Sequence, residues 1–123
     1  MNAAPLRAAF RLLFWAAAIF AYVCAIAPRH VGVVAYDKGN HVLAFFALGC
    51  LAKLGWPRRQ ALWIALALAG FGGFIEISQS MPIFHRDPEW DDLFADCVGI
   101  AGGMALGSLL LMAYHRVVPR QAD

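Results

Sequence analysis

Eight polar side chains stand where long apolar stretches of this 123-residue chain begin or end. They are Asp37, Lys38, His41, Glu76, Gln79, Arg86, Asp92 and Asp96. Charged groups inside or against a lipid bilayer are costly, and they usually mark a functional site with a partner close by. We therefore take these eight residues as the candidate site of the chain.

Four of these residues suggest acid–base chemistry on an anionic substrate. His41 is suited to act as a general base, because an imidazole gains and loses protons near neutral pH. Glu76 would orient His41 or share its proton. Arg86 and Lys38 carry the donors that bind a phosphate or a carboxylate group. Together they describe a membrane-embedded enzyme acting on a lipid or a lipid-linked envelope precursor.

Other interpretations use the same residues. Glu76, Asp92 and Asp96 could hold a divalent cation, since hard ions prefer carboxylate oxygens, although the sequence assigns no metal or cofactor. The charges could instead bind a ligand without turnover, or form only a polar network that joins three helices. A proton-coupled carrier built on His41 and Glu76 is disfavoured, because the polar residues occupy one end of the predicted bundle. No serine or cysteine stands in a recognisable nucleophile motif.

The helices that must position these residues are predicted to cross a membrane. The chain is 62% hydrophobic and only 15% charged, which is more apolar surface than a soluble domain of this size can bury. A spanning helix needs about 20 mainly apolar residues. The predicted spans are 10–27, 41–55, 61–79 and 92–114. The second run is short, so a re-entrant segment is the alternative there.

The sequence predicts an all-α integral membrane protein, a small antiparallel bundle of four transmembrane helices in a single domain over 1–123. Seven of the ten Lys and Arg residues lie at or near the chain ends or the junction of the second and third spans. Basic residues favour the cytoplasmic side, so both termini are expected in the cytoplasm and the polar residues at the outer leaflet. The first run ends like a signal peptide, but Pro28 would follow the cleavage site, and we treat the run as a span. The net charge of +2 gives no indication of nucleic-acid binding.

Small residues indicate how the helices could meet. The fourth span carries Gly99, Gly103 and Gly107, spaced four apart, and close packing of such residues drives helix association in membranes. We interpret this stripe as ordinary packing within the bundle; a homodimer seam through the same three glycines is the alternative. The three cysteines, Cys24, Cys50 and Cys97, lie singly in apolar runs and are predicted to be buried free thiols.

The order and spacing of the polar residues resemble the VanZ-like family. The resemblance rests on Asp37-Lys38-x-x-His41, Glu76-x-x-Gln79, Arg86, and Asp92-x-x-Ala95-Asp96-x-x-Gly99-x-x-x-Gly103. It covers 37–107 of the chain. Where the family commonly has Asn, this chain has Asp96, and the glycine that often precedes the family's arginine is missing.

The resemblance implies a small four-span protein of the bacterial inner membrane. The family is named for a protein linked to low-level resistance to the glycopeptide teicoplanin; its biochemical activity is unsettled, and most members lie outside resistance clusters. We therefore expect an envelope-related binding or modulating role at an extracytoplasmic polar pocket, with a membrane lipid or an envelope precursor as partner. The membrane-embedded enzyme is the alternative.

Overall fold

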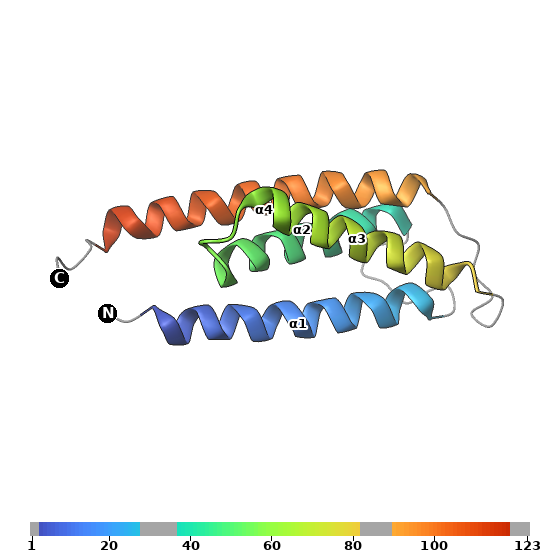
Figure 1. Cartoon of the computed structure of the whole chain (residues 1–123), viewed down its shortest axis with the longest axis horizontal. Coiled ribbons are helices and arrows are strands. Elements are labelled where there is room, and N and C mark those ends of the chain that lie inside the picture. Colours follow the sequence, from blue (N-terminus) through green and yellow to red (C-terminus); the bar gives the residue numbers. More distant parts are fainter. Residues whose placement is uncertain (1–2, 28–36, 82–89, 119–123) are drawn as a thin grey trace.

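A computed structural model of the chain describes residues 3–27, 37–81 and 90–118, with the side chains of Asp37 and Lys38 outside the description. These residues form four α-helices: α1 (Ala4–Ile26), α2 (Asp37–Gly55), α3 (Ala61–Gln79) and α4 (Asp91–Val117). The helices run side by side along one axis, and both chain ends lie at the same end of the bundle as the turn between α2 and α3 (Figure 1). The predicted all-α four-helix bundle is confirmed.

Three helices, α1, α3 and α4, are long and apolar enough to cross a membrane, and α2 carries a shorter apolar stretch, Gly39–Gly55. α2 nevertheless has 19 residues in total, which corresponds to about 28 Å at 1.5 Å per residue and approaches the roughly 30 Å of a hydrocarbon core. The polar residues at its start supply the missing length. α2 is one continuous helix that lies alongside α3 and α4 (Figure 1); that it crosses the membrane stays a prediction.

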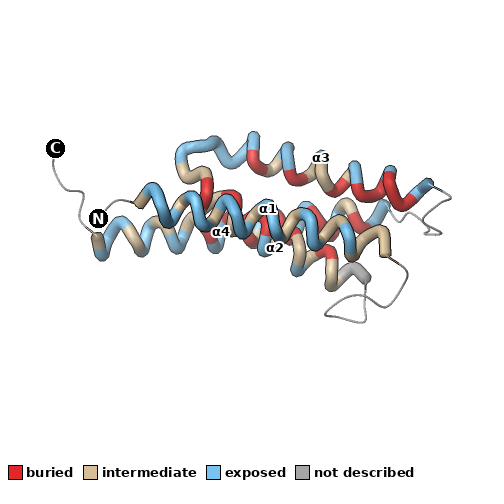
Figure 2. The backbone as a smooth tube through the Cα atoms, turned by 90° about the horizontal axis from the view of Figure 1, so that it is seen from below, coloured by how far each residue is buried: buried red, intermediate tan, exposed pale blue. Residues whose placement is uncertain are grey.

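Large apolar side chains cover the outside of the bundle. Leu12 is 73% exposed and Phe94 75% exposed, and exposed positions recur along α1, α3 and α4 in Figure 2. A soluble protein of this size does not leave so much apolar surface in water, whereas lipid tails accept it. The three cysteines are free thiols, as predicted, but none is buried: Cys24 and Cys50 are half-buried and Cys97 is exposed on the outer face of α4. The prediction of buried thiols is therefore wrong.

The closest packing in the bundle lies between α2 and α4. A Cβ atom added to Gly99 would come within 2.5 Å of the Val42 carbonyl oxygen, and one added to Gly103 would overlap the carbonyl oxygen of Phe46. Gly107 approaches Lys53 in the same way. The glycine stripe of α4 therefore faces α2 within one chain, as the bundle-packing interpretation expects. A homodimer through these glycines stays a prediction that a single chain does not test.

The apolar core lies along the same contact and extends to α3. Its most deeply buried members are Phe45 and Leu48 of α2, Ile75 of α3 and Ile100 of α4. α1 has no buried residue and packs at the edge of the bundle. Two contacts near the turn between α2 and α3 fix it there: Arg11 Nε donates a hydrogen bond to the Gly55 carbonyl at 2.8 Å, and Phe14 meets Trp56 edge-on.

Candidate functional site

Five of the eight predicted site residues come together at the end of the bundle away from the chain termini. His41 lies near the start of α2, Glu76 and Gln79 in the last turns of α3, and Asp92 and Asp96 in the first turns of α4. All five are buried, with Glu76 and Asp96 at 0% exposure. We call His41, Glu76, Asp92 and Asp96 the polar cluster.

His41 is the centre of the polar cluster. Its Nδ1 lies 2.7 Å from Asp96 Oδ1, and its Nε2 lies 3.6 Å from Asp92 Oδ2. The imidazole is therefore placed between two carboxylates that α4 presents one turn apart, since residues i and i+4 share a helix face. A carboxylate that accepts a hydrogen bond from Nδ1 fixes the tautomer and the ring orientation, and leaves Nε2 to act on a ligand.

Asp96 accepts the hydrogen bond of His41, whereas the sequence suggested Glu76 for the orienting role. Both carboxylates are in reach of the same ring, because α3 and α4 meet at this end of the bundle. The ligand atoms of His41, Glu76 and Asp92 all lie within 4.8 Å of one another. The catalytic roles predicted for His41 and Glu76 stay predictions, but the geometry gives Asp96 the position behind the imidazole.

A glycine that the sequence did not single out for this purpose makes room for Asp96. An added Cβ at Gly72 of α3 would come within 2.5 Å of Asp96 Oδ2. The second carboxylate oxygen of Asp96 thus lies against the backbone of α3. Gly72 precedes Glu76 by four residues, so one face of α3 supplies both a charged side chain and the gap beside it.

A family model described as VanZ/LLP1 matches residues 5–112 of the chain. That match covers most of the sequence and includes every member of the polar cluster. The chain belongs to the VanZ/LLP1 family. No curated protein and no solved structure is similar enough to this chain to match it.

The remaining predicted site residues of this VanZ/LLP1 member do not belong to the polar cluster, although Gln79 lies at the same end of the bundle. Gln79 donates a hydrogen bond through Nε2 to the Ala25 carbonyl of α1 at 2.8 Å, so its amide joins α3 to α1. Asp37 and Lys38 belong to the first turn of α2, but their side chains lie outside the described residues, as does Arg86. Their predicted part in ligand binding stays a prediction.

Two further residues at this end escaped the sequence interpretation. Tyr22 of α1 donates its hydroxyl hydrogen bond to Ser78 Oγ at 3.2 Å, and its ring stacks on Phe74. Ser78 is buried. In the sequence, Tyr22 and Ser78 each appear as a single hydroxyl group near the end of an apolar run. The sequence does not show that these two hydroxyl groups bond to each other. Together with the Gln79 amide, this contact closes α1 over α3 beside the polar cluster.

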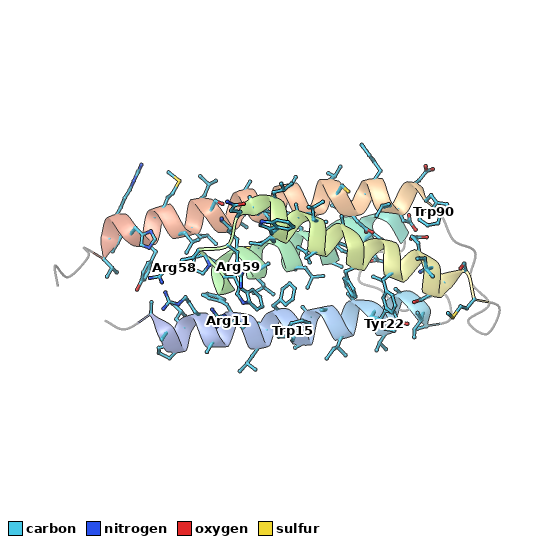
Figure 3. The ribbon with its side chains drawn as sticks, in the orientation of Figure 1. Arg11, Trp15, Tyr22, Arg58, Arg59 and Trp90 are labelled. Carbon is cyan, nitrogen blue, oxygen red and sulfur yellow. The ribbon has the colours of Figure 1, made fainter. Side chains whose placement is uncertain are left out.

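The opposite end of the bundle is basic. Arg7, Arg11, Arg58 and Arg59 line a pocket of about 380 Å³ with Trp56 and Pro57. In Figure 3 the labelled arginines lie at the end of the chain termini, and Tyr22 and Trp90 lie towards the other end. The described residues thus separate into a basic end and an end whose buried charges are mainly acidic.

Proposed function

We propose that this VanZ/LLP1 member is a bacterial inner-membrane protein that binds an amphiphilic envelope molecule at the polar cluster and so modulates an envelope process. One observation carries the proposal: His41, Glu76, Asp92 and Asp96 converge, buried, from three helices. A bundle held together only by apolar packing and glycines has no need of four ionisable groups at one point. A ligand that enters from the adjacent lipid would meet them directly.

The distribution of charge supports an outward-facing site. Basic residues stay on the cytoplasmic side of a membrane, and the arginine-lined pocket lies at the end with both termini. The polar cluster then reaches the outer leaflet, where lipid-linked precursors of the envelope are used. A membrane lipid or such a precursor is the partner that this position favours, and an altered response to teicoplanin is the phenotype that the family suggests.

A membrane-embedded enzyme is the second candidate, and the contact between His41 and Asp96 favours it. An imidazole held by a buried carboxylate at 2.7 Å is the arrangement of a general base whose second nitrogen faces the substrate. The substrate would be the same class of lipid-linked molecule. Binding and catalysis differ in what His41 does to the ligand once the ligand is in place.

Thermal unfolding of the full chain in detergent tests the proposal, with undecaprenyl phosphate, undecaprenyl diphosphate and phosphatidylglycerol as separate probes. A ligand at 100 times its dissociation constant stabilises the folded state by about 2.7 kcal/mol. We expect at least one probe to raise the melting temperature of wild type and of Asp91→Asn, which changes a neighbouring exposed carboxylate. Glu76→Gln should lose the shift.

The variant His41→Gln then distinguishes the two candidate functions, when both the shift in melting temperature and the conversion of the probe are measured. An enzyme keeps the ligand-induced shift in this variant but no longer converts the probe, whereas a binding protein shows no conversion in wild type either. Equal shifts in wild type and Glu76→Gln, or no shift with any probe, would contradict the proposed site. Expression of wild type and Glu76→Gln in a susceptible host, followed by growth on teicoplanin, tests the suggested phenotype separately.

A further inference from the structure

Three potential metal ligands from three different helices meet in the polar cluster. His41 of α2, Glu76 of α3 and Asp92 of α4 each offer one ligand atom, and these atoms lie within 4.8 Å of one another. All three side chains are buried. Ligands held at bonds of about 2.0–2.2 Å to one ion can stand up to about 4.4 Å apart, so a closure of a few tenths of an ångström would bring them to bonding distance.

The orientation of His41 fits metal binding. A histidine that binds a metal through one ring nitrogen usually donates the other N–H to a carboxylate, which fixes the ring and increases its basicity. Asp96 Oδ1 occupies that second position, 2.7 Å from Nδ1. The remaining nitrogen, Nε2, lies 3.6 Å from Asp92 Oδ2, which is one of the other two ligands.

Asp96 itself supplies an independent indication that a cation belongs here. Its side chain is 0% exposed, and its Oδ2 has no hydrogen-bond partner among the described residues. That oxygen lies against Gly72, one helical turn from Glu76 along α3. A buried carboxylate with an unsatisfied oxygen is costly unless a positive charge lies close by. Protonated His41 is one such charge, and an ion bound by His41, Glu76 and Asp92 would supply it when the imidazole is neutral.

We propose that His41, Glu76 and Asp92 bind one divalent transition-metal ion, with Asp96 orienting His41 from behind. One imidazole nitrogen and two carboxylate oxygens suit Zn²⁺ or Mn²⁺ better than Ca²⁺ or Mg²⁺, which prefer oxygen alone. Three protein ligands leave a coordination position for an outside group. The inference deepens the proposed function and rests on it for the identity of the bound lipid. The ion would give the acidic cluster the positive charge that binds the phosphate of a lipid headgroup.

Metal titration of the full chain, purified in detergent without a polyhistidine tag and stripped with chelator, tests this site. Co²⁺ serves as the spectroscopic probe. Zn²⁺ binding is followed by calorimetry and Mn²⁺ binding by electron paramagnetic resonance. We expect one ion per chain, with a Co²⁺ spectrum that lacks a thiolate charge-transfer band. Affinity should fall at least 100-fold in Glu76→Gln and in Asp92→Asn. Asp96→Asn, which keeps an acceptor for His41, should lose roughly tenfold.

Matched variants keep the test decisive. Asp91→Asn removes the carboxylate adjacent to Asp92, and His115→Gln removes an exposed imidazole from the other end of α4; neither should change the affinity. Wild type that binds no stoichiometric ion, binding that Glu76→Gln and Asp92→Asn leave unchanged, or binding of Mg²⁺ or Ca²⁺ alone would each overturn the proposal. If Glu76→Gln does not fold, the expected tenfold loss of metal affinity in Asp96→Asn still tests the proposal.

Because metal binding is measured without any lipid, its failure is distinct from failure of the proposed function. The lipid probes are therefore tested on both the metal-loaded and the chelator-stripped protein. A shift that requires the loaded form supports a metal-bridged headgroup. A shift of equal size in the stripped form would leave the envelope-binding role in place and overturn the bridging role of the ion.

Discussion

At the scale of single residues, the pairing of His41 with Asp96 organises the polar cluster. Asp96 takes the position behind the imidazole, 2.7 Å from Nδ1, and Gly72 leaves the space in which its second oxygen fits. An aspartate at this point brings a charge that the Asn common in the VanZ-like family does not. The hydrogen bond itself needs only an acceptor, which Asn also has.

Replacing Asp96 separates the hydrogen bond from the charge. Asp96→Leu leaves a buried His41 nitrogen without its partner, and we expect the free energy of unfolding to fall by about 1–3 kcal/mol. Asp96→Asn should lose about 1 kcal/mol or less, because an acceptor remains. Unfolding in mixed detergent micelles measures both, with Ala105→Ile on the exposed face of α4 as an unchanged control. If the Asn variant were as unstable as the Leu variant, the charge rather than the hydrogen bond would hold His41.

Gly72 gives a second prediction. A helix gains about 1 kcal/mol when Ala replaces Gly at an unobstructed position, and Gly73 has nothing within 4 Å of an added Cβ. Gly73→Ala should therefore raise the melting temperature. Gly72→Ala should lower it, at a cost of about 1–3 kcal/mol, because the new methyl group meets Asp96 Oδ2. In an Asp96→Ala background that cost should disappear; a cost that persists there would place the obstruction elsewhere.

At the scale of the elements, the contact between α2 and α4 decides how the bundle is built. Gly99 and Gly103 bring the two backbones together, and the same approach brings His41 beside Asp96 at the end of the contact. α3 adds Glu76 from a third side, and α1 covers α3 through Tyr22 and Gln79. The geometry of the polar cluster is therefore a consequence of helix packing.

A bulky residue in the glycine stripe tests this contact. Gly103→Ile should destabilise the folded chain by about 3 kcal/mol, because its side chain would enter the backbone of α2 near Phe46. Ala105→Ile, on an exposed face of α4, is the matched control and should unfold like wild type. Micelle unfolding gives the stability, and light scattering after size exclusion gives the mass. A variant that remains folded but changes from dimer to monomer would instead favour the homodimer seam.

At the scale of the whole molecule, charge and hydropathy orient the chain. The arginine-lined pocket and both termini lie at one end, and the polar cluster lies at the other (Figures 1 and 3). Basic residues resist transfer across a membrane. The basic end is therefore expected in the cytoplasm, which is the orientation that the proposed function needs.

Labelling of single cysteines measures this orientation. In a background with Cys24, Cys50 and Cys97 replaced by Ala, we expect Trp90→Cys to react with a membrane-impermeant maleimide in intact cells. Arg59→Cys, in the turn between α2 and α3, should react only after the membrane is opened. The reverse pattern would place the polar cluster at the cytoplasmic face and remove the support for an outer-leaflet ligand.

The sequence by itself determined the four helices and the end at which the polar residues gather. Hydropathy and helix length are local properties that the bilayer imposes, so α3 was predicted with the bounds that the structure gives, 61–79. Helix ends near polar residues were less certain: α1 begins at Ala4 and α4 continues to Val117, beyond the most apolar part of each run.

Only the tertiary structure decided which polar groups meet. The sequence placed His41, Glu76 and Asp96 at one end of the bundle but could not say which carboxylate holds the imidazole, because that depends on the rotation and depth of each helix. Those two quantities come from packing against neighbouring helices, here the glycines of α4 against α2. The space that Gly72 leaves for Asp96 has the same origin: it exists only where two helices, far apart in sequence, fix each other's positions.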